Sequence, residues 1–93
     1  NFFELFKLPE KFQIDTEKLQ ENYRSIQKEI HPDRFATSSE NEKMQSMIKT
    51  TQINDAYQTL KSPIKRAKYI FVRVLARHVR NFDTEIKRVR RNH

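Results

Sequence analysis

The tripeptide His31-Pro32-Asp33 carries the side chains best suited to chemistry or to binding. An imidazole and a carboxylate two residues apart could act as a general base with its orienting carboxylate, or they could present a polar surface to a partner. Pro32 fixes its own backbone torsion and restricts His31 to extended conformations, so both polar side chains would lose little entropy on binding. We favour binding over an enzyme, because no nucleophile and no third member of a triad are placed beside the pair.

An amphipathic helix is predicted immediately before this tripeptide. Asp15 offers a side-chain acceptor that can cap a helix, and apolar residues then recur at spacings of four, three and four. The helix should end at His31, because a residue that precedes proline is pushed out of the α region. The apolar face consists of Leu19, Tyr23, Ile26 and Ile30.

A second helix is predicted after a polar loop that covers residues 33–41. Ser39, with Glu42 three positions later, has the form of a capping box. Two antiparallel helices joined by an exposed loop follow, because each apolar stripe can cover the other. Functional groups concentrate in such loops, because a rigid scaffold holds them out. On the second helix we expect the buried side to comprise Met44, Met47, Ile48, Ile53, Ala56, Tyr57 and Leu60.

A further helix is predicted from Ser62-Pro63 towards the end of the chain. Ser62 can cap it, and Pro63 suits the first helical position, where its missing N–H costs nothing. A three-four apolar spacing continues to Val89, although Asn81 and Asp83 leave a break open. Because this repeat is shorter than the roughly three or four heptads of a firm coiled coil, we favour a charged, solvated helix that packs one stripe on the domain. So long an apolar face must be covered, so we expect it to fold back on the domain or to pair between chains. The stripe consists of Val72, Leu75, Val79, Phe82, Ile86 and Val89.

Composition favours one small all-helical domain. The chain has 93 residues, no cysteine and no glycine. Disulfides and cysteine-based metal or iron–sulfur sites are therefore excluded, and the glycine-dependent hairpins of sheet proteins are disfavoured. No apolar run approaches the roughly 20 residues that span a bilayer. We expect a soluble intracellular chain with no cofactor and no membrane partner.

Positive charge is concentrated at the end of the chain. The formal net charge is +7, of which residues 1–72 contribute +2 and residues 73–93 contribute +5. Clustered arginines suit phosphate contacts, so a basic helical nucleic-acid-binding module is the alternative function. We do not expect nucleic acid as the primary partner, because no zinc-finger or RNA-recognition signature accompanies the charge. His78 and His93 are solitary, which disfavours a metal site.

Several motifs in fixed order resemble the J-domain family of co-chaperones. His31-Pro32-Asp33 follows a helix that bears Tyr23 and Arg24. Residues 53–60, Ile-Asn-Asp-Ala-Tyr-Gln-Thr-Leu, close the next helix, and residues 65–69, Lys-Arg-Ala-Lys-Tyr, extend the match. The resemblance covers residues 1 to about 70.

A narrower resemblance is to the HscB branch of this family, the iron–sulfur co-chaperones. It rests on residues 3–9, Phe-Glu-Leu-Phe-Lys-Leu-Pro, on Ile14-Asp15 and on residues 31–35, His-Pro-Asp-Arg-Phe. Lys7 departs from this pattern, because these proteins usually carry glycine there.

The resemblance implies an all-α J-domain with a long antiparallel helix pair, an exposed His-Pro-Asp loop, a short N-terminal helix and a C-terminal helix. It also implies docking on a DnaK/HscA-type chaperone and stimulation of its ATPase, in iron–sulfur cluster assembly. Asp33 would pair with an arginine of the ATPase, and His31 would support the loop or contact the chaperone. The implied docking residues are His31, Pro32, Asp33, Tyr23, Arg24 and Lys28.

The end of the chain departs from the family more strongly than Lys7 does. The family normally continues into a C-terminal helical domain that holds the iron–sulfur scaffold protein, and the remaining residues are too few for that domain. We therefore expect a J-domain in residues 1–72 and a basic C-terminal helical extension in residues 73–93, truncated or foreign to the family. The implied location is the bacterial cytoplasm, or the mitochondrial matrix in a eukaryote.

Overall fold

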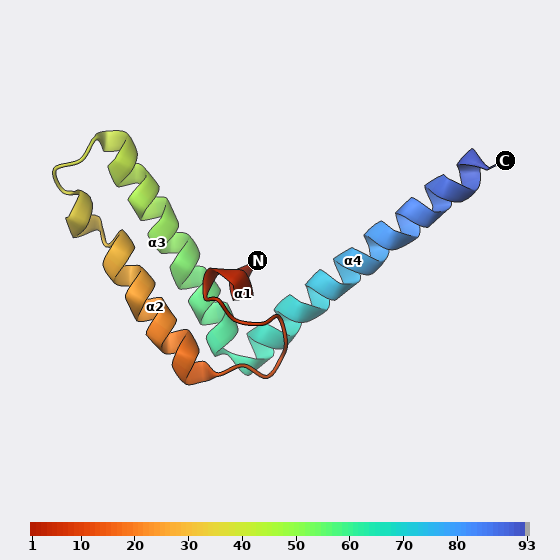
Figure 1. Ribbon diagram of the computed structural model, residues 1–93, viewed down its shortest axis with the longest axis horizontal. Coiled ribbons are helices and arrows are strands. Elements are labelled where there is room, and N and C mark those ends of the chain that lie inside the picture. The colour runs from red at the N-terminus through yellow and green to blue at the C-terminus, as the bar shows by residue number, and fades with distance from the viewer. Residues whose placement is uncertain (93) are drawn as a thin grey trace.

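The structure, a computed structural model, describes residues 1–92, and every regular element in that range is helical. The elements are α1 (Phe2–Leu5), α2 (Thr16–Ile30), the 3-10 helix η1 (Pro32–Phe35), α3 (Glu40–Lys61) and α4 (Pro63–Arg91). Helices α2 and α3 lie side by side and antiparallel, with η1 in the loop that joins them (Figure 1). The predicted all-α architecture is confirmed.

All three predicted helix caps are present. In each case the capping side chain accepts a hydrogen bond from the backbone N–H three residues later, at 3.1 Å for Asp15, 3.2 Å for Ser39 and 3.3 Å for Ser62. These bonds satisfy N–H groups that have no partner within the helix. Pro63 occupies the first turn of α4, as predicted. The local sequence therefore fixes where α2, α3 and α4 begin.

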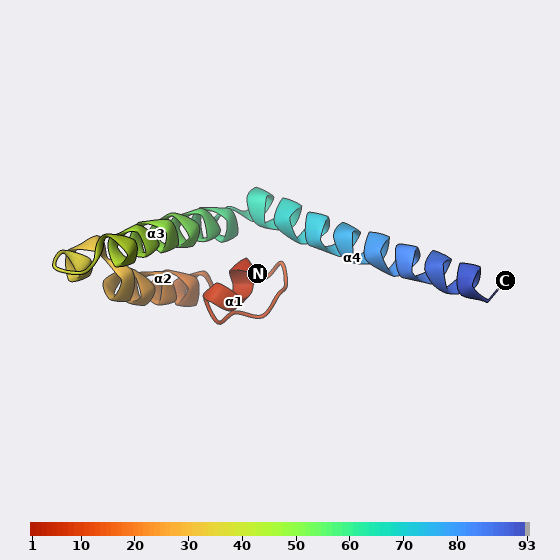
Figure 2. The ribbon, with the colours of Figure 1, turned by 90° about the horizontal axis from the view of Figure 1, so that it is seen from above.

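The core lies where α1 packs against the helix pair. Phe3 and Phe6 are fully buried, and α1 lies near the end of the pair from which α4 leaves (Figure 2). Tyr23 of α2 and Tyr57 of α3 stack with ring centroids 3.9 Å apart, which seals one side of this core. The remaining buried apolar residues are Leu8, Leu19, Ile53, Ala56 and Leu60.

The prediction for the first half of α3 is wrong. Met44, Met47 and Ile48 are 59%, 62% and 46% exposed, whereas Ser46 is buried. A helix repeats every 3.6 residues, which places these three side chains on the side opposite Ile53. The prediction placed them on the face that packs on α2 because it considered their apolar character and not their angular position around the helix.

Buried Arg66 joins the end of α3 to the start of α4. Its Nη1 donates to the carbonyl oxygen of Leu60 at 2.7 Å, which satisfies one of the free carbonyls at the helix end. The guanidinium also lies over the ring of Phe12, 4.9 Å from its centroid. This arrangement fixes the bend at which α4 leaves the helix pair.

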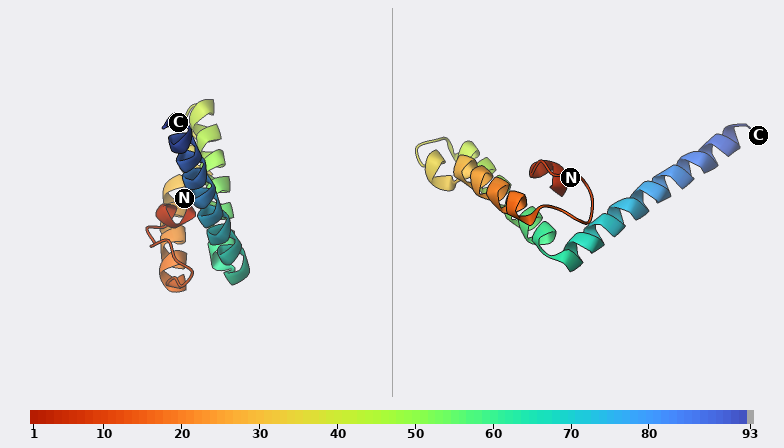
Figure 3. Two further views of the ribbon diagram at one scale, coloured as in Figure 1. Left: turned by 90° about the vertical axis from the view of Figure 1, so that its right-hand side faces the viewer. Right: turned by 60° about the horizontal axis from the view of Figure 1, so that its bottom comes forward.

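Helix α4 does not fold back on the domain, so the first of the two expected alternatives was wrong, whereas pairing between chains stays a prediction. It continues without a break through Asn81 and Asp83 to Arg91 and projects away from the helix pair (Figures 1 and 3). The ion pair between Lys87 and Asp83, at 3.1 Å and four residues apart, supports this stretch of helix. The side of α4 that carries Tyr69, Arg73 and Arg77, rather than the apolar stripe, is turned towards the domain.

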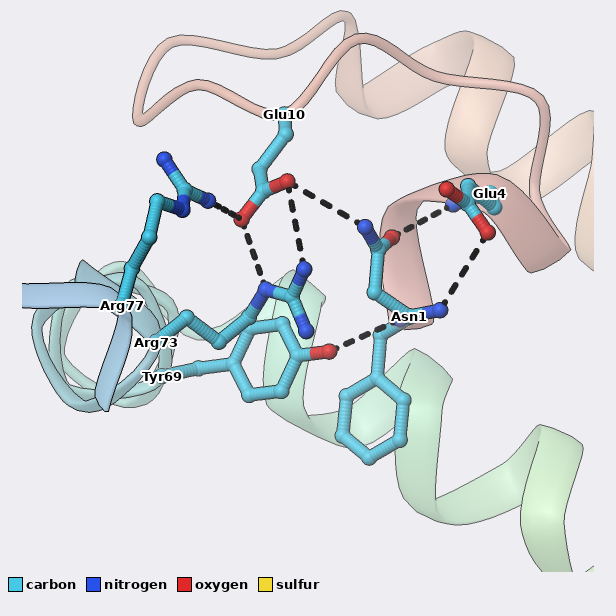
Figure 4. A network of polar contacts seen from close by, with 7 residues as sticks. Asn1, Glu4, Glu10, Tyr69, Arg73 and Arg77 are labelled. Carbon is cyan, nitrogen blue, oxygen red and sulfur yellow. Dashed lines mark hydrogen bonds and ion pairs between the residues drawn. The ribbon is translucent and has the colours of Figure 1, made fainter. Parts of the chain in front are cut away.

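A polar network explains that orientation (Figure 4). The Glu10 carboxylate accepts hydrogen bonds from Arg73 Nε at 2.6 Å and from Arg73 Nη2 at 3.4 Å, and Arg77 Nη2 lies 3.7 Å from it. Nearby, the Phe2 N–H donates to the Tyr69 hydroxyl at 2.9 Å. The hydrogen bond from Arg73 lowers the pKa of the Glu10 carboxyl and raises the pKa of the guanidinium. Together these contacts hold the first turns of α4 against α1 and the loop that follows it.

Candidate functional site

The His31-Pro32-Asp33 loop lies at the end of the helix pair that is remote from α4 (Figure 1). His31 ends α2 in an extended conformation, with φ −56° and ψ 133°, as its position before proline predicts. Pro32 then begins η1. The Asp33 side chain is 93% exposed and that of His31 is 58% exposed. The loop therefore presents both polar groups to solvent on a constrained backbone.

The imidazole of His31 braces the loop from within. Its Nδ1 accepts a hydrogen bond from the backbone N–H of Asp33 at 3.2 Å. A nitrogen that accepts in this way carries no proton, so its 3.6 Å separation from Asp33 Oδ2 is not an ion pair in this geometry. In a histidine–carboxylate general base the Nδ1–H donates to the carboxylate instead. The arrangement leaves Nε2 and both Asp33 oxygens available to a partner.

Arg34 closes the loop against the end of α2, a role that sequence reasoning did not assign. Its Nη1 lies 3.4 Å from the carbonyl oxygens of both Lys28 and Glu29. These carbonyls belong to the last turn of α2, where a cation also interacts favourably with the helix dipole. A basic residue just after a helix end is the sequence signal that could have identified it.

Ser46 fixes the same helix end from the side of α3. Its hydroxyl donates to the carbonyl oxygen of Ile30 at 2.8 Å, and the residue is only 5% exposed. Together with Arg34, this bond supports the backbone on which His31 stands. Ser46 was also missed, because its role depends on the pairing of α2 with α3 and no local pattern indicates it.

Arg24 and Lys28 lie on the exposed outer face of α2, four residues apart. Among the ion pairs of residues 1–92, none involves either side chain. Lys28 is three residues before His31, so this basic face continues into the loop. Five of the six predicted docking residues are thus exposed, on α2 and on the loop that follows it.

Tyr23, the sixth predicted residue, is committed to contacts inside the domain. Its hydroxyl donates to Asn54 Oδ1 at 2.6 Å and accepts from Gln27 Nε2 at 2.9 Å. The ring stacks on Tyr57, and the residue is only partly exposed. In this structure Tyr23 therefore links α2 to α3, beside the basic face.

No group of three or more metal-ligating side chains occurs within residues 1–92. His93, which was considered as a ligand, lies outside the described residues. None of the helices in the described part of the chain combines the length and the apolar composition needed to cross a bilayer. At the loop, the exposed side chains of His31 and Asp33 can form hydrogen bonds and charge pairs.

Comparison with known proteins identifies relatives of most of the chain. The family model of the DnaJ domain matches residues 1–69. A protein of Vibrio parahaemolyticus named "Co-chaperone protein HscB homolog" is 56% identical over 70 residues, which cover 75% of this chain and 41% of the relative. A protein of the same name from Shewanella baltica is 51% identical over 75% of this chain and 40% of its own length. The chain thus spans about two-fifths of the length of these relatives.

Solved structures show the same similarity. The chaperone HscB from Vibrio cholerae has a TM-score of 0.76 and 49% sequence identity, over 77% of this chain and 43% of that chain. The human co-chaperone protein HscB has a TM-score of 0.75 and 39% identity, over 76% of this chain and 36% of that chain. Residues 1–69, which the family model matches, include the helix pair and the loop between its helices.

Proposed function

Because the chain belongs to the DnaJ-domain family, we propose that it is a co-chaperone module that docks on a DnaK/HscA-type chaperone through the His31-Pro32-Asp33 loop and stimulates its ATPase. The observation that carries the proposal is the loop itself, which is exposed yet fixed by Pro32 and by the bonds of His31 and Arg34. A loop that is ordered before binding loses little entropy when it docks. In this proposal the chain performs no covalent chemistry, and the chaperone hydrolyses the ATP.

Each part of the surface has a separate role in the proposed complex. The Asp33 carboxylate pairs with a cationic group of the ATPase, for which a guanidinium is the best geometric match. His31 keeps the loop in shape through Nδ1 and offers Nε2 to the partner. Arg24 and Lys28 attract an acidic surface and orient the approach, because exposed charges act mainly on association.

We extend the proposal to iron–sulfur cluster assembly, because the sequence resembles the HscB branch and the relatives carry that name. A scaffold protein would then be engaged through the part of the HscB relatives that this chain does not match. The bacterial cytoplasm, or the mitochondrial matrix in a eukaryote, is the location that this role implies.

The test is His31→Gln, measured by single-turnover ATP hydrolysis with a DnaK-type and an HscA-type chaperone. We expect stimulation to fall to the basal rate of the chaperone. The fold should survive, because His31 is exposed and lies outside the core. Circular dichroism checks the helix content of the variant.

His78→Gln is the matched control, because it makes the same change on the exposed face of α4. This control should stimulate as the parent does. If folded His31→Gln stimulates the ATPase as well as the parent, the loop does not dock in the way proposed.

A further inference from the structure

Helix α4 carries an exposed apolar stripe that nothing in residues 1–92 covers. Each of its six side chains is at least 37% exposed, and Phe82 reaches 69%. A continuous exposed stripe of this kind on a small domain marks an interaction surface. We call it the seam, and it consists of Val72, Leu75, Val79, Phe82, Ile86 and Val89.

The spacing of the seam is that of a two-stranded coiled coil. Successive members are three, four, three, four and three residues apart, which is a heptad pattern with Val72 at position a. The a positions then hold β-branched Val72, Val79 and Ile86. Leu75 and Phe82 occupy two of the three d positions. In parallel coiled coils, β-branched residues at a together with leucine at d favour two strands, and Leu75 supplies such a leucine.

The domain approaches α4 from the side opposite the seam. Arg73 and Arg77, which contact Glu10, occupy positions b and f of this heptad. A second helix at the seam would therefore not meet the arginines that bind Glu10, whose network Figure 4 shows. Beyond its first turns α4 extends alone, which leaves room for such a helix along its length (Figure 2).

The charged side chains of α4 are also placed so that two copies of the chain can pair through the seam. Apart from Arg90, the basic residues from 73 onwards lie at the outer positions b, c and f, away from the seam. Glu85 and Arg90 flank the seam at positions g and e, and these positions face each other across a parallel dimer. Within one chain Glu85 Oε1 accepts from Arg88 Nη2 at 2.7 Å, so its second oxygen can accept from Arg90 of another copy.

The same arrangement disfavours an anionic lipid surface as the occupant. Helices that lie on membranes place basic residues beside the apolar face, where they meet the headgroups. Here Asp83 and Glu85, the acidic residues of α4, flank the seam. An anionic surface at the seam would therefore meet two carboxylates and, among the basic residues, only Arg90.

We propose that two copies of the chain pair through the seam as a parallel two-stranded coiled coil. Because the seam spans only about two and a half heptads, the dimer dissociates on dilution. Parallel pairing places both His-Pro-Asp loops on domains at the same end of the coil. The proposal does not depend on ATPase stimulation, and its tests measure mass and orientation alone.

Sedimentation equilibrium of the full chain tests the pairing. The apparent mass should rise with concentration from 11.3 kDa towards twice that value. Leu75→Ala combined with Phe82→Ala should weaken the dimer more than about 100-fold. Arg80→Ala with Thr84→Ala truncates two side chains at outer positions of the same helix and should leave the dimer intact. A parent that stays monomeric up to about 1 mM, or a seam variant that pairs like the parent, overturns the proposal.

A charge exchange tests the parallel orientation. Glu85→Arg and Arg90→Glu should each weaken pairing, because like charges then face each other across the dimer. The double variant should restore it, and an equimolar mixture of the two single variants should form heterodimers. A double variant no tighter than either single one overturns parallel pairing. A parent monomer that binds phosphatidylserine vesicles through the seam overturns pairing altogether.

Discussion

Lys7 adopts a left-handed backbone conformation, with φ 55°. The Lys7 N–H donates to the Glu4 carbonyl and the Leu8 N–H donates to the Phe3 carbonyl, both at 3.0 Å. These two bonds form a Schellman motif at the end of α1, in which glycine is the usual residue at the left-handed position. The departure from the family's glycine therefore falls where a Cβ is unfavourable.

Lys7→Gly should raise the free energy of unfolding by about 0.5–1 kcal/mol. A residue with a Cβ in the left-handed conformation costs about 1–2 kcal/mol, which glycine avoids. Part of this stabilisation is lost, because glycine also raises the conformational entropy of the unfolded chain. Denaturant unfolding measures the difference. Lys11→Gly, in the exposed loop that follows and without a positive φ, should lower stability instead. Equal effects of the two substitutions would show that the Lys7 conformation is not strained.

Arg24→Glu combined with Lys28→Glu should slow association with the chaperone several-fold and flatten its dependence on salt. Exposed charges act mainly by steering, and salt screens them within about 10 Å. Stopped-flow binding at several ionic strengths measures both effects. Lys65→Glu with Lys68→Glu changes the net charge equally at exposed positions of α4. If both pairs slow binding alike, total charge rather than the α2 face controls association.

The conformation of a single residue could be predicted where its neighbours in the sequence determine it. Pro32 determines the backbone of His31 through steric contact alone, and the helix caps follow from short spacings. Ser46 and Tyr23 behave differently, because their partners lie 16 and 31 residues away in sequence. The sequence therefore located the loop but not the contacts that brace it.

Among the elements, α3 shows what apolar pattern alone leaves undetermined. Its second half packs through Ile53, Ala56 and Leu60, as predicted, whereas the apolar residues of its first half face solvent. A list of apolar residues does not specify the phase of a helix, and the buried Ser46 that continues the packed face is polar. The direction of α4 was missed for a related reason, because it depends on contacts distant in sequence, such as the ion pair of Arg73 with Glu10 and the stacking of Tyr69 on Phe2.

Glu10→Gln should loosen the attachment of α4 in a pH-dependent way. The pKa of Glu10 is lower in the folded chain than in the unfolded chain, where a glutamate has a pKa of about 4.3. The carboxylate therefore contributes its full stabilisation at a pH above the unfolded pKa, and this contribution disappears as the pH falls through the folded pKa. At neutral pH we expect a loss of at most about 1 kcal/mol, because the pair is partly exposed and screened.

Denaturant unfolding between neutral pH and pH 3 measures this loss. The difference between parent and Glu10→Gln should shrink as the solution becomes acidic. Glu21→Gln is the control, because Glu21 is exposed on α2 and takes part in none of the ion pairs of residues 1–92. A difference that stays constant with pH would mean that Glu10 acts through shape rather than charge.

The whole molecule is more extended than a compact domain of its length. Its radius of gyration is 18.2 Å and its extents are 62 × 33 × 18 Å. A compact chain of this length would have a radius of about 12 Å. The excess comes from α4, which projects from one end of the helix pair while the His-Pro-Asp loop lies at the other (Figure 1). The proposed docking surface and the proposed pairing surface thus lie at opposite ends of the molecule.

Because the two surfaces are separate, we expect that a variant without residues 78–93 still stimulates ATP hydrolysis by the chaperone to within a few-fold of the parent, compared at equal concentrations of the domain. The cut lies after Arg77, so both arginines that contact Glu10 remain. Binding to RNA or DNA should fall sharply, because it depends on counterion release by clustered basic residues and Arg80, Lys87, Arg88, Arg90 and Arg91 are lost. Single-turnover ATP hydrolysis and filter binding at two salt concentrations measure the two effects, with circular dichroism as the check on folding. A folded deletion variant without ATPase stimulation would place part of α4 in the docking surface, and the two ends of the molecule would then not act separately.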